Sequence, residues 1–237
     1  MVRKRDMQYS MLVLVSNSFA SYLERCAFEV IALLCGIFPG DQAIIAIGSN
    51  AIVFQISTFL FMFFLGASIA GNIRIGNALG AGDTHRAKVA CWLTLFLGLF
   101  LAALTTSFLI FFRHRLPYLF TTDEDLVKKA ESLFLVVGLY QLPDAINAVQ
   151  QGIFKGIGKQ ALAAKLNFIS YYVVGIPLGI LFGFKLGWGV EGLWLGMTAG
   201  LCFASCANGI ILYRCDWEEL THDTRKRLSI IMPHNLA

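Results

Sequence analysis

Six long apolar blocks constrain this 237-residue chain more than any other feature of its sequence. Each block has about 20 residues or more, which as a helix is enough to cross a hydrocarbon core of roughly 30 Å. Inside lipid every backbone N–H and C=O must be hydrogen-bonded within the protein, and an apolar run of this length achieves that only as a helix. The predicted spans cover about residues 11–38, 43–70, 89–112, 126–154, 161–184 and 190–213.

The composition agrees with an all-α membrane protein. Hydrophobic residues make up 57% of the chain and charged residues 14%, against about 25% charged residues in soluble proteins. This excludes soluble enzymes, and the lack of alternating ten-residue segments argues against an outer-membrane barrel. We therefore expect a six-helix transmembrane bundle over residues 1–213 and a polar cytoplasmic tail over 214–237.

The tail and the remaining composition limit the possible partners. The tail is mixed in charge and predicts a short solvated helix or a disordered segment, with lipid contact by Arg225, Lys226 and Arg227 as a weaker interpretation. The net charge of +4 is modest and does not suggest nucleic acid. The six cysteines lie in or next to apolar blocks without histidines at ligand spacing, so we expect no disulfide, metal or other bound cofactor.

The Lys and Arg residues predict the orientation. Thirteen fall on the side that carries both termini and five on the other, while Arg25 lies inside the first block. By the positive-inside rule, the side with thirteen basic residues is cytoplasmic. We expect a multi-pass protein of the plasma membrane, with a reversed or shared orientation as the alternative.

Three acidic residues fall inside predicted spans, where each costs about 2.5–3.5 kcal/mol even on a lenient scale. Two of them, Glu24 and Glu29, lie in the first span about 140° apart, which predicts that they do not share one face. Glu29 is four residues after Arg25, so an ion pair within the helix is as good an explanation as a function. Glu24 has no such partner in its own span, which favours a role as a proton carrier over a purely structural one.

The third acid, Asp144, follows Pro143 in the middle of the fourth span. Proline removes a backbone donor and predicts a kink there, and broken helices are where transporters build their central sites. Asn147, Gln150 and Gln151 continue a polar stripe from Asp144 along one helix face. A hydrogen-bonded seam between helices is the alternative.

Two adjacent tyrosines, Tyr171 and Tyr172, lie in the fifth span together with Pro177. Tyrosines that face a cavity can stack on a planar organic cation. Ordinary packing is the favoured interpretation for tyrosine in an apolar helix.

Three stretches resemble the multidrug and toxin extrusion (MATE) transporters, especially the eukaryotic members. They are R-I-G-N-A-L-G-A-G from Arg74, K-G-I-G-K-Q from Lys155 and Y-Y-V-V-G-I-P-L-G from Tyr171, and G-L-W from Gly192 fits as well. Read from its residues alone, the first stretch predicts a tight cytoplasmic turn. The likeness covers nearly the whole chain but only the second of the two six-helix lobes of such a transporter.

The resemblance implies a role for the acids. Glu24, Glu29 and Asp144 match carboxylates of that lobe that are proposed to couple proton entry to the export of organic cations. Two departures put cation selectivity in doubt. Gln55 stands where animal members often have a glutamate, and Arg25 stands where an aromatic residue is common.

The leading hypothesis is therefore one lobe of a proton-coupled antiporter for organic cations or other xenobiotics. Glu24, Glu29, Asp144, Gln55, Asn147, Tyr171 and Tyr172 are the candidate coupling and substrate-binding residues. Protons are the expected coupling ion, although sodium also suits carboxylates and carbonyls. The lobe would work with a second lobe or as a homodimer. A non-transporting subunit that regulates a full-length transporter is the alternative.

Overall fold

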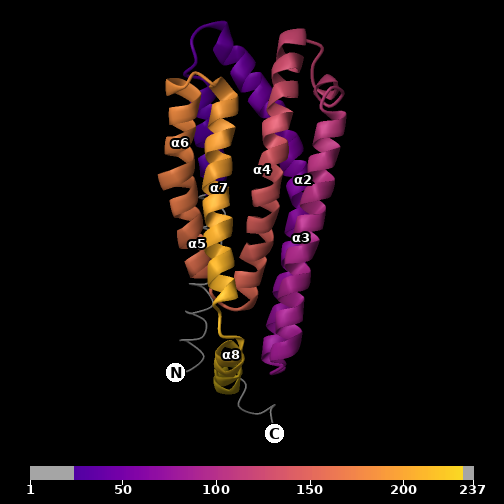
Figure 1. The fold of residues 1–237 in the computed structure, drawn as a ribbon, viewed down its shortest axis with the longest axis vertical. Helices are drawn as coiled ribbons and strands as arrows, with labels where there is room; N and C mark the ends of the chain where they lie inside the picture. Colours follow the sequence, from indigo (N-terminus) through magenta and orange to yellow (C-terminus); the bar gives the residue numbers. More distant parts are fainter. Residues whose placement is uncertain (1–23, 232–237) are drawn as a thin grey trace.

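The structure is a computed structural model that describes residues 24–231, with side chains described for 24–226. Within these ranges every regular element is a helix, and five helical segments are long and apolar enough to cross a membrane. The first predicted span is described only from residue 24 and is helical over 24–35, so its part at 11–23 lies outside the described residues. Figure 1 shows the long helices side by side along the long axis of the molecule, with the last helix below one end of the bundle.

The second and third spans, α2 (Asp41–Gly80) and α3 (Thr84–Phe112), are longer than the apolar runs that predicted them. The last turns of α2 are helical because Ile75 and Leu79 remain fully buried in a cluster that includes Phe154. The prediction of a turn over the stretch from Arg74 was therefore wrong for most of its length, and the turn is confined to 81–83. Asp83 begins α3 early, since its side chain accepts a hydrogen bond from the Arg86 N–H.

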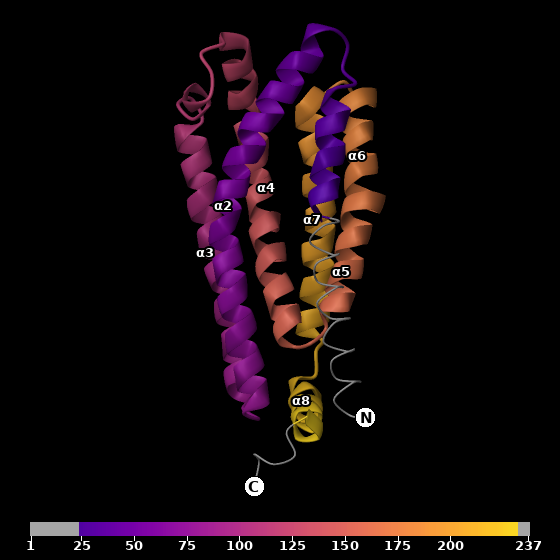
Figure 2. The same ribbon diagram turned by 180° about the vertical axis from the view of Figure 1, so that it is seen from behind.

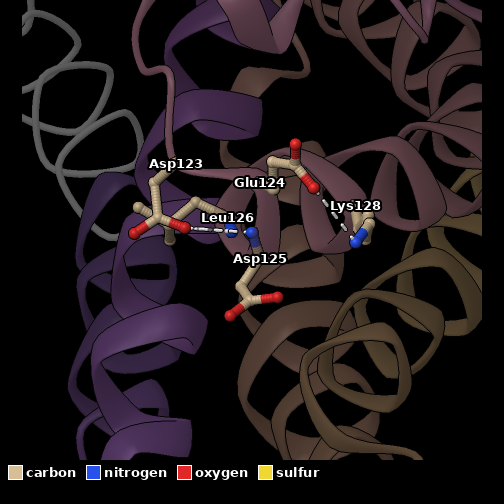
Figure 3. A network of polar contacts seen from close by, with 5 residues as sticks. All are labelled: Asp123, Glu124, Asp125, Leu126 and Lys128. Carbon is tan, nitrogen blue, oxygen red and sulfur yellow. Dashed lines mark hydrogen bonds and ion pairs between the residues drawn. The ribbon is translucent and has the colours of Figure 1, made fainter.

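The fourth span, α4, covers Glu124–Gly156. Its first turn is capped by Asp123, whose carboxylate accepts hydrogen bonds from the N–H groups of Asp125 and Leu126 at 2.9 and 3.3 Å (Figure 3). The helix continues through Pro143 without interruption. The kink expected at this proline stays a prediction.

The fifth span is assembled from four helical segments that follow one another without a break. They are α5 (Gln160–Phe168), the π-helix η2 (Ile169–Gly175), α6 (Ile176–Ile180) and the π-helix η3 (Leu181–Lys185). Pro177 lacks a backbone N–H and lies just after η2, where a widened turn absorbs the lost hydrogen bond. Tyr171 and Tyr172 both belong to this π-helix.

The last span, α7 (Gly189–Tyr213), packs unusually closely on the fifth. A Cβ on Gly196 would overlap the backbone of Gly179, and a Cβ on Gly200 would stand 2.5 Å from the carbonyl oxygen of Ser170. The Ser170 hydroxyl donates a hydrogen bond across the same contact to the Gly200 carbonyl. Small residues at four-residue spacing allow this approach of two backbones, as is common between membrane helices.

The tail forms the helix α8 (Trp217–Ile231), one of the two forms expected for it. Trp217 and Leu220 are buried in the cluster that contains Leu79 of α2 and Cys91 of α3. The hydroxyls of Thr221 and Thr84 are hydrogen-bonded at 2.9 Å. The helix is therefore docked on the bundle rather than fully solvated, and it joins the end of α7 to the α2–α3 turn.

The connections alternate between the two ends of the bundle. The turns at 81–83 and 157–159 lie at the end that carries α8, and the connections at 36–40, 113–123 and 186–188 lie at the opposite end (Figures 1 and 2). This is the alternation on which the predicted orientation depends. The assignment of the α8 end to the cytoplasm, with both termini, stays a prediction.

Candidate functional site

A pocket of about 360 Å³ lies among the first helix, α2 and α4, with contributions from α5 and α7. Its wall contains three carboxylates, two basic groups, several hydroxyls and amides, and a row of aromatic and aliphatic side chains. The lining residues are Glu24, Arg25, Phe28, Glu29, Phe54, Ser57, Thr58, Phe61, Met62, Leu65, Ser68, Tyr140, Asp144, Asn147, Ala148, Gln151, Lys155, Gln160, Asn167 and Trp194. A volume of this size suits a small organic ligand.

Glu24 faces the pocket from the first helix and is held by a partner from the fifth span. The Tyr171 hydroxyl donates a hydrogen bond of 2.8 Å to Glu24 Oε1. Tyr171 itself is buried and does not line the pocket. Of the two interpretations considered for it, packing inside the bundle therefore holds and stacking on a ligand in a cavity does not. The hydrogen bond to Glu24 is an additional role. No partner for Glu24 is expected in its own span, and the structure supplies one from a distant helix.

Asp144 faces the same pocket from α4 and is 5% exposed. The Tyr140 hydroxyl, one turn earlier on α4, donates a hydrogen bond of 3.3 Å to Asp144 Oδ1. Asn147, one turn later, lines the pocket too. Two carboxylates from different helices, each bonded to one tyrosine, thus meet in one pocket and can bind a proton or a cation there.

Glu29 also lines the pocket, which corrects the expectation that it cannot share a face with Glu24. The pocket wraps around a wide arc of the first helix, so positions 24, 28, 25 and 29 all border it. The ion pair considered as one of two explanations for Glu29 does not form, because none of the ion pairs among the described residues joins it to Arg25. Both side chains are exposed.

Besides Tyr171, two of the predicted site residues do not line the pocket. Gln55 is exposed on α2, and its neighbours Phe54 and Ser57 take the pocket-facing positions. Tyr172 is half-buried and stacks on Phe168, with ring centroids 5.0 Å apart. The structure therefore brings Glu24, Glu29, Asp144 and Asn147 together at the wall.

The polar stripe on α4 contributes both to the pocket wall and to a hydrogen-bonded seam between helices, the two roles considered for it. Asp144, Asn147 and Gln151 line the pocket, while Gln150 turns to α7 and donates a hydrogen bond of 3.0 Å to the Ser205 carbonyl. The Ser205 hydroxyl in turn donates to the Pro143 carbonyl at 3.0 Å. The seam thus fastens α4 to α7 directly behind the pocket wall.

An aromatic cluster forms one side of the pocket, and the sequence interpretation missed most of it. Phe28 lies at its centre, with its ring centroid 5.2 Å from that of Phe54, 6.2 Å from Tyr140 and 6.0 Å from Trp194. The Trp194 Nε1 donates a hydrogen bond to Asn50 Oδ1, which fixes the indole. Aromatic faces next to carboxylates are suited to organic cations. One available signal was that Phe28 follows Glu24 by four residues.

Several polar atoms in the pocket wall have no hydrogen-bond partner among the described residues. They are Ser57 Oγ, Gln151 Nε2 and Asn167 Oδ1. Buried polar atoms are usually hydrogen-bonded, so an unpartnered group in a pocket wall is available to a polar ligand.

Comparison with known proteins decides the family. The family model described as MatE matches residues 18–181, which is more than half of the chain and includes Glu24, Asp144 and Tyr171. The chain belongs to the MatE family. The resemblance read from the sequence motifs is therefore confirmed.

Curated relatives carry MATE names in several organisms. Multidrug and toxin extrusion protein 1 of Danio rerio is 32% identical over 208 residues, which are 88% of this chain and 35% of the relative. Multidrug and toxin extrusion protein 2 of Homo sapiens is 31% identical, with coverages of 86% and 33%. Protein DETOXIFICATION 49 of Arabidopsis thaliana is 32% identical, with coverages of 87% and 41%. The chain thus spans about a third of the length of most MatE relatives it matches.

Solved structures give the same fold. The eukaryotic MATE transporter AtDTX14 matches with a TM-score of 0.80 and 26% identity, over 85% of this chain and 45% of that protein. An outward-facing multidrug resistance MATE transporter matches with a TM-score of 0.78 and 17% identity, over 92% of this chain and 49% of that protein, and shows the fold alone. Each match covers just under half of a MatE transporter, as expected of one six-helix lobe.

Proposed function

We propose that the chain forms one six-helix lobe of a proton-coupled antiporter that exports organic cations or other xenobiotics. The observation that carries the proposal is the meeting of Glu24 and Asp144 beside an aromatic wall in one pocket. Membership of a family whose relatives are named for multidrug and toxin extrusion supports the same function. We place the protein in a plasma membrane with the α8 end in the cytoplasm.

The mechanism follows from the competition of protons and substrate for the same carboxylates. With both carboxylates ionised, the pocket attracts a cation, whose charge they neutralise. When protons enter from outside, neutral carboxyls bind the cation less well, and the substrate is released. Tyr171 and Tyr140 hold the two carboxyls in place during the exchange.

The proposal is tested with the purified chain in liposomes that contain ethidium. An acidic exterior drives protons inward, and we expect dye efflux from the wild-type chain. Glu24→Gln and Asp144→Asn should each abolish the efflux, because an amide cannot exchange the proton. Gln55→Leu is the matched control, since Gln55 lies outside the pocket, and it should keep the wild-type rate.

Undiminished efflux in both amide variants would refute the roles of the two acids. If an imposed sodium gradient drives efflux and a pH gradient does not, sodium rather than the proton is the coupling ion. If the folded wild-type chain is silent alone, the assay is repeated with a second six-helix lobe coexpressed, supplied by any coding region upstream of Met1 or by another MATE protein. Silence in both cases would favour a subunit that regulates a full-length transporter.

A further inference from the structure

The helix α8 has one packed face and one exposed face. Trp217, Leu220 and Thr221 are buried, and their spacing of three and four residues places them on one side of the helix. Glu219 and Asp223, on the other side, are exposed. A small contact, in which Trp217 and Leu220 supply the large apolar side chains, therefore holds α8 on the bundle.

Two further contacts tie α8 to the start of α3 and to the turn before it. The Thr221 hydroxyl donates a hydrogen bond of 2.8 Å to the Trp217 carbonyl, so in its 2.9 Å bond with Thr84 it is the acceptor. The Arg225 side chain lies over Gly82, since a Cβ at Gly82 would stand 3.1 Å from Arg225 Cδ. The contacts of α8 thus reach the whole α2–α3 turn.

The beginning of α8 is joined covalently to α7. Residues 214–216 connect Tyr213, the last residue of α7, to Trp217. The helix α7 is itself fastened to α4 through the seam at Gln150 and Ser205. Figure 2 shows α8 beneath the end of α7 and level with the ends of α2 and α3. It therefore connects the α4–α7 pair to the α2–α3 turn.

A change in the width of the pocket acts on this connection. The helices α2 and α7 both contribute to the pocket wall, through Phe54 and Trp194. A hydrogen bond from Trp194 to Asn50 joins them toward the opposite end, so they separate most easily at the α8 end. Packed contacts switch between discrete arrangements rather than stretching. Because α8 is covalently attached to α7, such a separation would break its contacts with α2 and α3.

We propose that α8 is a strap, which holds the α2–α3 turn to the end of α7 and must detach before the lobe completes a transport cycle. This inference rests on the proposed export function and adds the step that limits its rate. Elements that move during function are drawn from the least stable contacts of a fold, and the contact of α8 is small. In many enzymes the opening of a lid, rather than the chemistry, limits turnover in the same way.

A reversible lock tests whether the strap must detach. In a variant without native cysteines, Thr84→Cys and Thr221→Cys replace two hydrogen-bonded hydroxyls by thiols that can form a disulfide while α8 is docked. Oxidation with copper phenanthroline should reduce ethidium efflux at least about tenfold, because the locked strap cannot open, and dithiothreitol should restore it. Thr84→Cys with Glu219→Cys is the matched control, since Glu219 lies on the exposed side of α8, and oxidation should leave its efflux rate unchanged.

Loosening the strap should have the opposite effect. Leu220→Ala removes a buried side chain from the contact and should speed efflux roughly twofold or more. The thiol of Thr221→Cys is buried while α8 is docked, so its labelling by a maleimide reports detachment. Leu220→Ala should speed this labelling about tenfold. Glu219→Ala is the matched control and should change neither rate.

The failures are distinguishable. Full efflux from the oxidised Thr84→Cys, Thr221→Cys variant would overturn the strap and leave the proposed export function standing. The same holds for a Thr221→Cys thiol that never reacts in protein with normal efflux, or for faster labelling of Leu220→Ala without faster efflux. If the wild-type chain gives no efflux, alone or with a second lobe, the proposed export function fails first and the strap fails with it.

Discussion

Each of the two central carboxylates is held by one tyrosine, and the two tyrosines differ in origin. Tyr140 precedes Asp144 by one turn of the same helix, so this pair moves as a unit. Tyr171 comes from the fifth span and reaches Glu24 on the first, so this bond joins two helices that are distant in sequence. The Glu24–Tyr171 bond is therefore sensitive to any relative movement of those helices.

Removal of the Tyr171 hydroxyl tests that bond. Tyr171→Phe should slow pH-driven efflux roughly three- to tenfold, the effect of losing one ordinary hydrogen bond. Tyr213→Phe, an exposed tyrosine at the end of α7, is the control and should keep the wild-type rate. A slower rate in the control, or an unchanged rate in Tyr171→Phe, would contradict the prediction.

The acids were predictable because a charge in a membrane span is expensive and needs a reason. The same cost argument identified Glu24, Glu29 and Asp144, which all line the pocket. It could not identify Phe28 or Trp194, since an aromatic residue in an apolar helix is equally compatible with lipid, core or cavity. Gln55 became a candidate through the family resemblance and lies outside the pocket, because the face of α2 that borders the pocket depends on how that helix is rotated in the bundle.

At the scale of the elements, α7 and the fifth span pack closely through glycines. Gly196 and Gly200 of α7 meet Gly179 and Gly175 with almost no side chain between the backbones. The π-helical turns of the fifth span, η2 and η3, lie along this contact. Since η2 carries Tyr171, the glycine contact helps to determine where the Glu24 partner stands.

A single methyl group should disturb this contact. Gly196→Ala places a Cβ against the backbone of Gly179 and should destabilise the protein by about 1–3 kcal/mol, the usual cost of overpacking. Gly66→Ala on α2 is the matched control, because a Cβ there meets nothing within 4 Å. It should be neutral or slightly stabilising, since alanine is the better helix former.

Thermal unfolding of both variants in detergent, followed by tryptophan fluorescence, measures the difference. Equal unfolding temperatures for Gly196→Ala and the wild type would mean that the two helices can separate at no cost, and the glycine contact would lose its structural role.

The helix ends show where hydropathy stops being informative. The predicted range 190–213 and the observed α7 differ by one residue, because its apolar run and its helix coincide. For α2 they differ by ten residues at the end, because Arg74 and Asn77 interrupt the apolar pattern while Ile75 and Leu79 keep the helix packed. A polar residue does not end a helix whose other face stays packed. A hydropathy profile cannot distinguish such a residue from one that lies at a true helix end.

At the scale of the whole molecule, the chain has the two-ended arrangement of a membrane bundle. The outer surface exposes many large apolar side chains, among them Phe96 and Phe100 of α3, Leu139 of α4 and Ile210 of α7. The connections between the long helices lie at the two ends (Figure 2), and they contain many polar and charged residues. The charge distribution over those ends is the basis for assigning the α8 end to the cytoplasm.

Cysteine labelling tests this orientation. In a variant without native cysteines, Thr122→Cys at one end should react with a membrane-impermeant maleimide added to intact cells. His222→Cys on α8 should react only after the membrane is permeabilised. Both positions are exposed, so access is set by the side of the membrane rather than by burial. The opposite labelling pattern would reverse the predicted orientation.

The length of α2 has a mechanical consequence. Its 40 residues form a rod of about 60 Å, roughly twice the thickness of the hydrocarbon core. Near the middle the rod carries Phe54 and Ser68 of the pocket, and at its far end it meets α8. A tilt of about 10°, pivoting at one end, displaces the other end of such a rod by roughly 10 Å. A tilt of α2 caused by ligand binding at the pocket would therefore displace most the end of α2 that contacts α8.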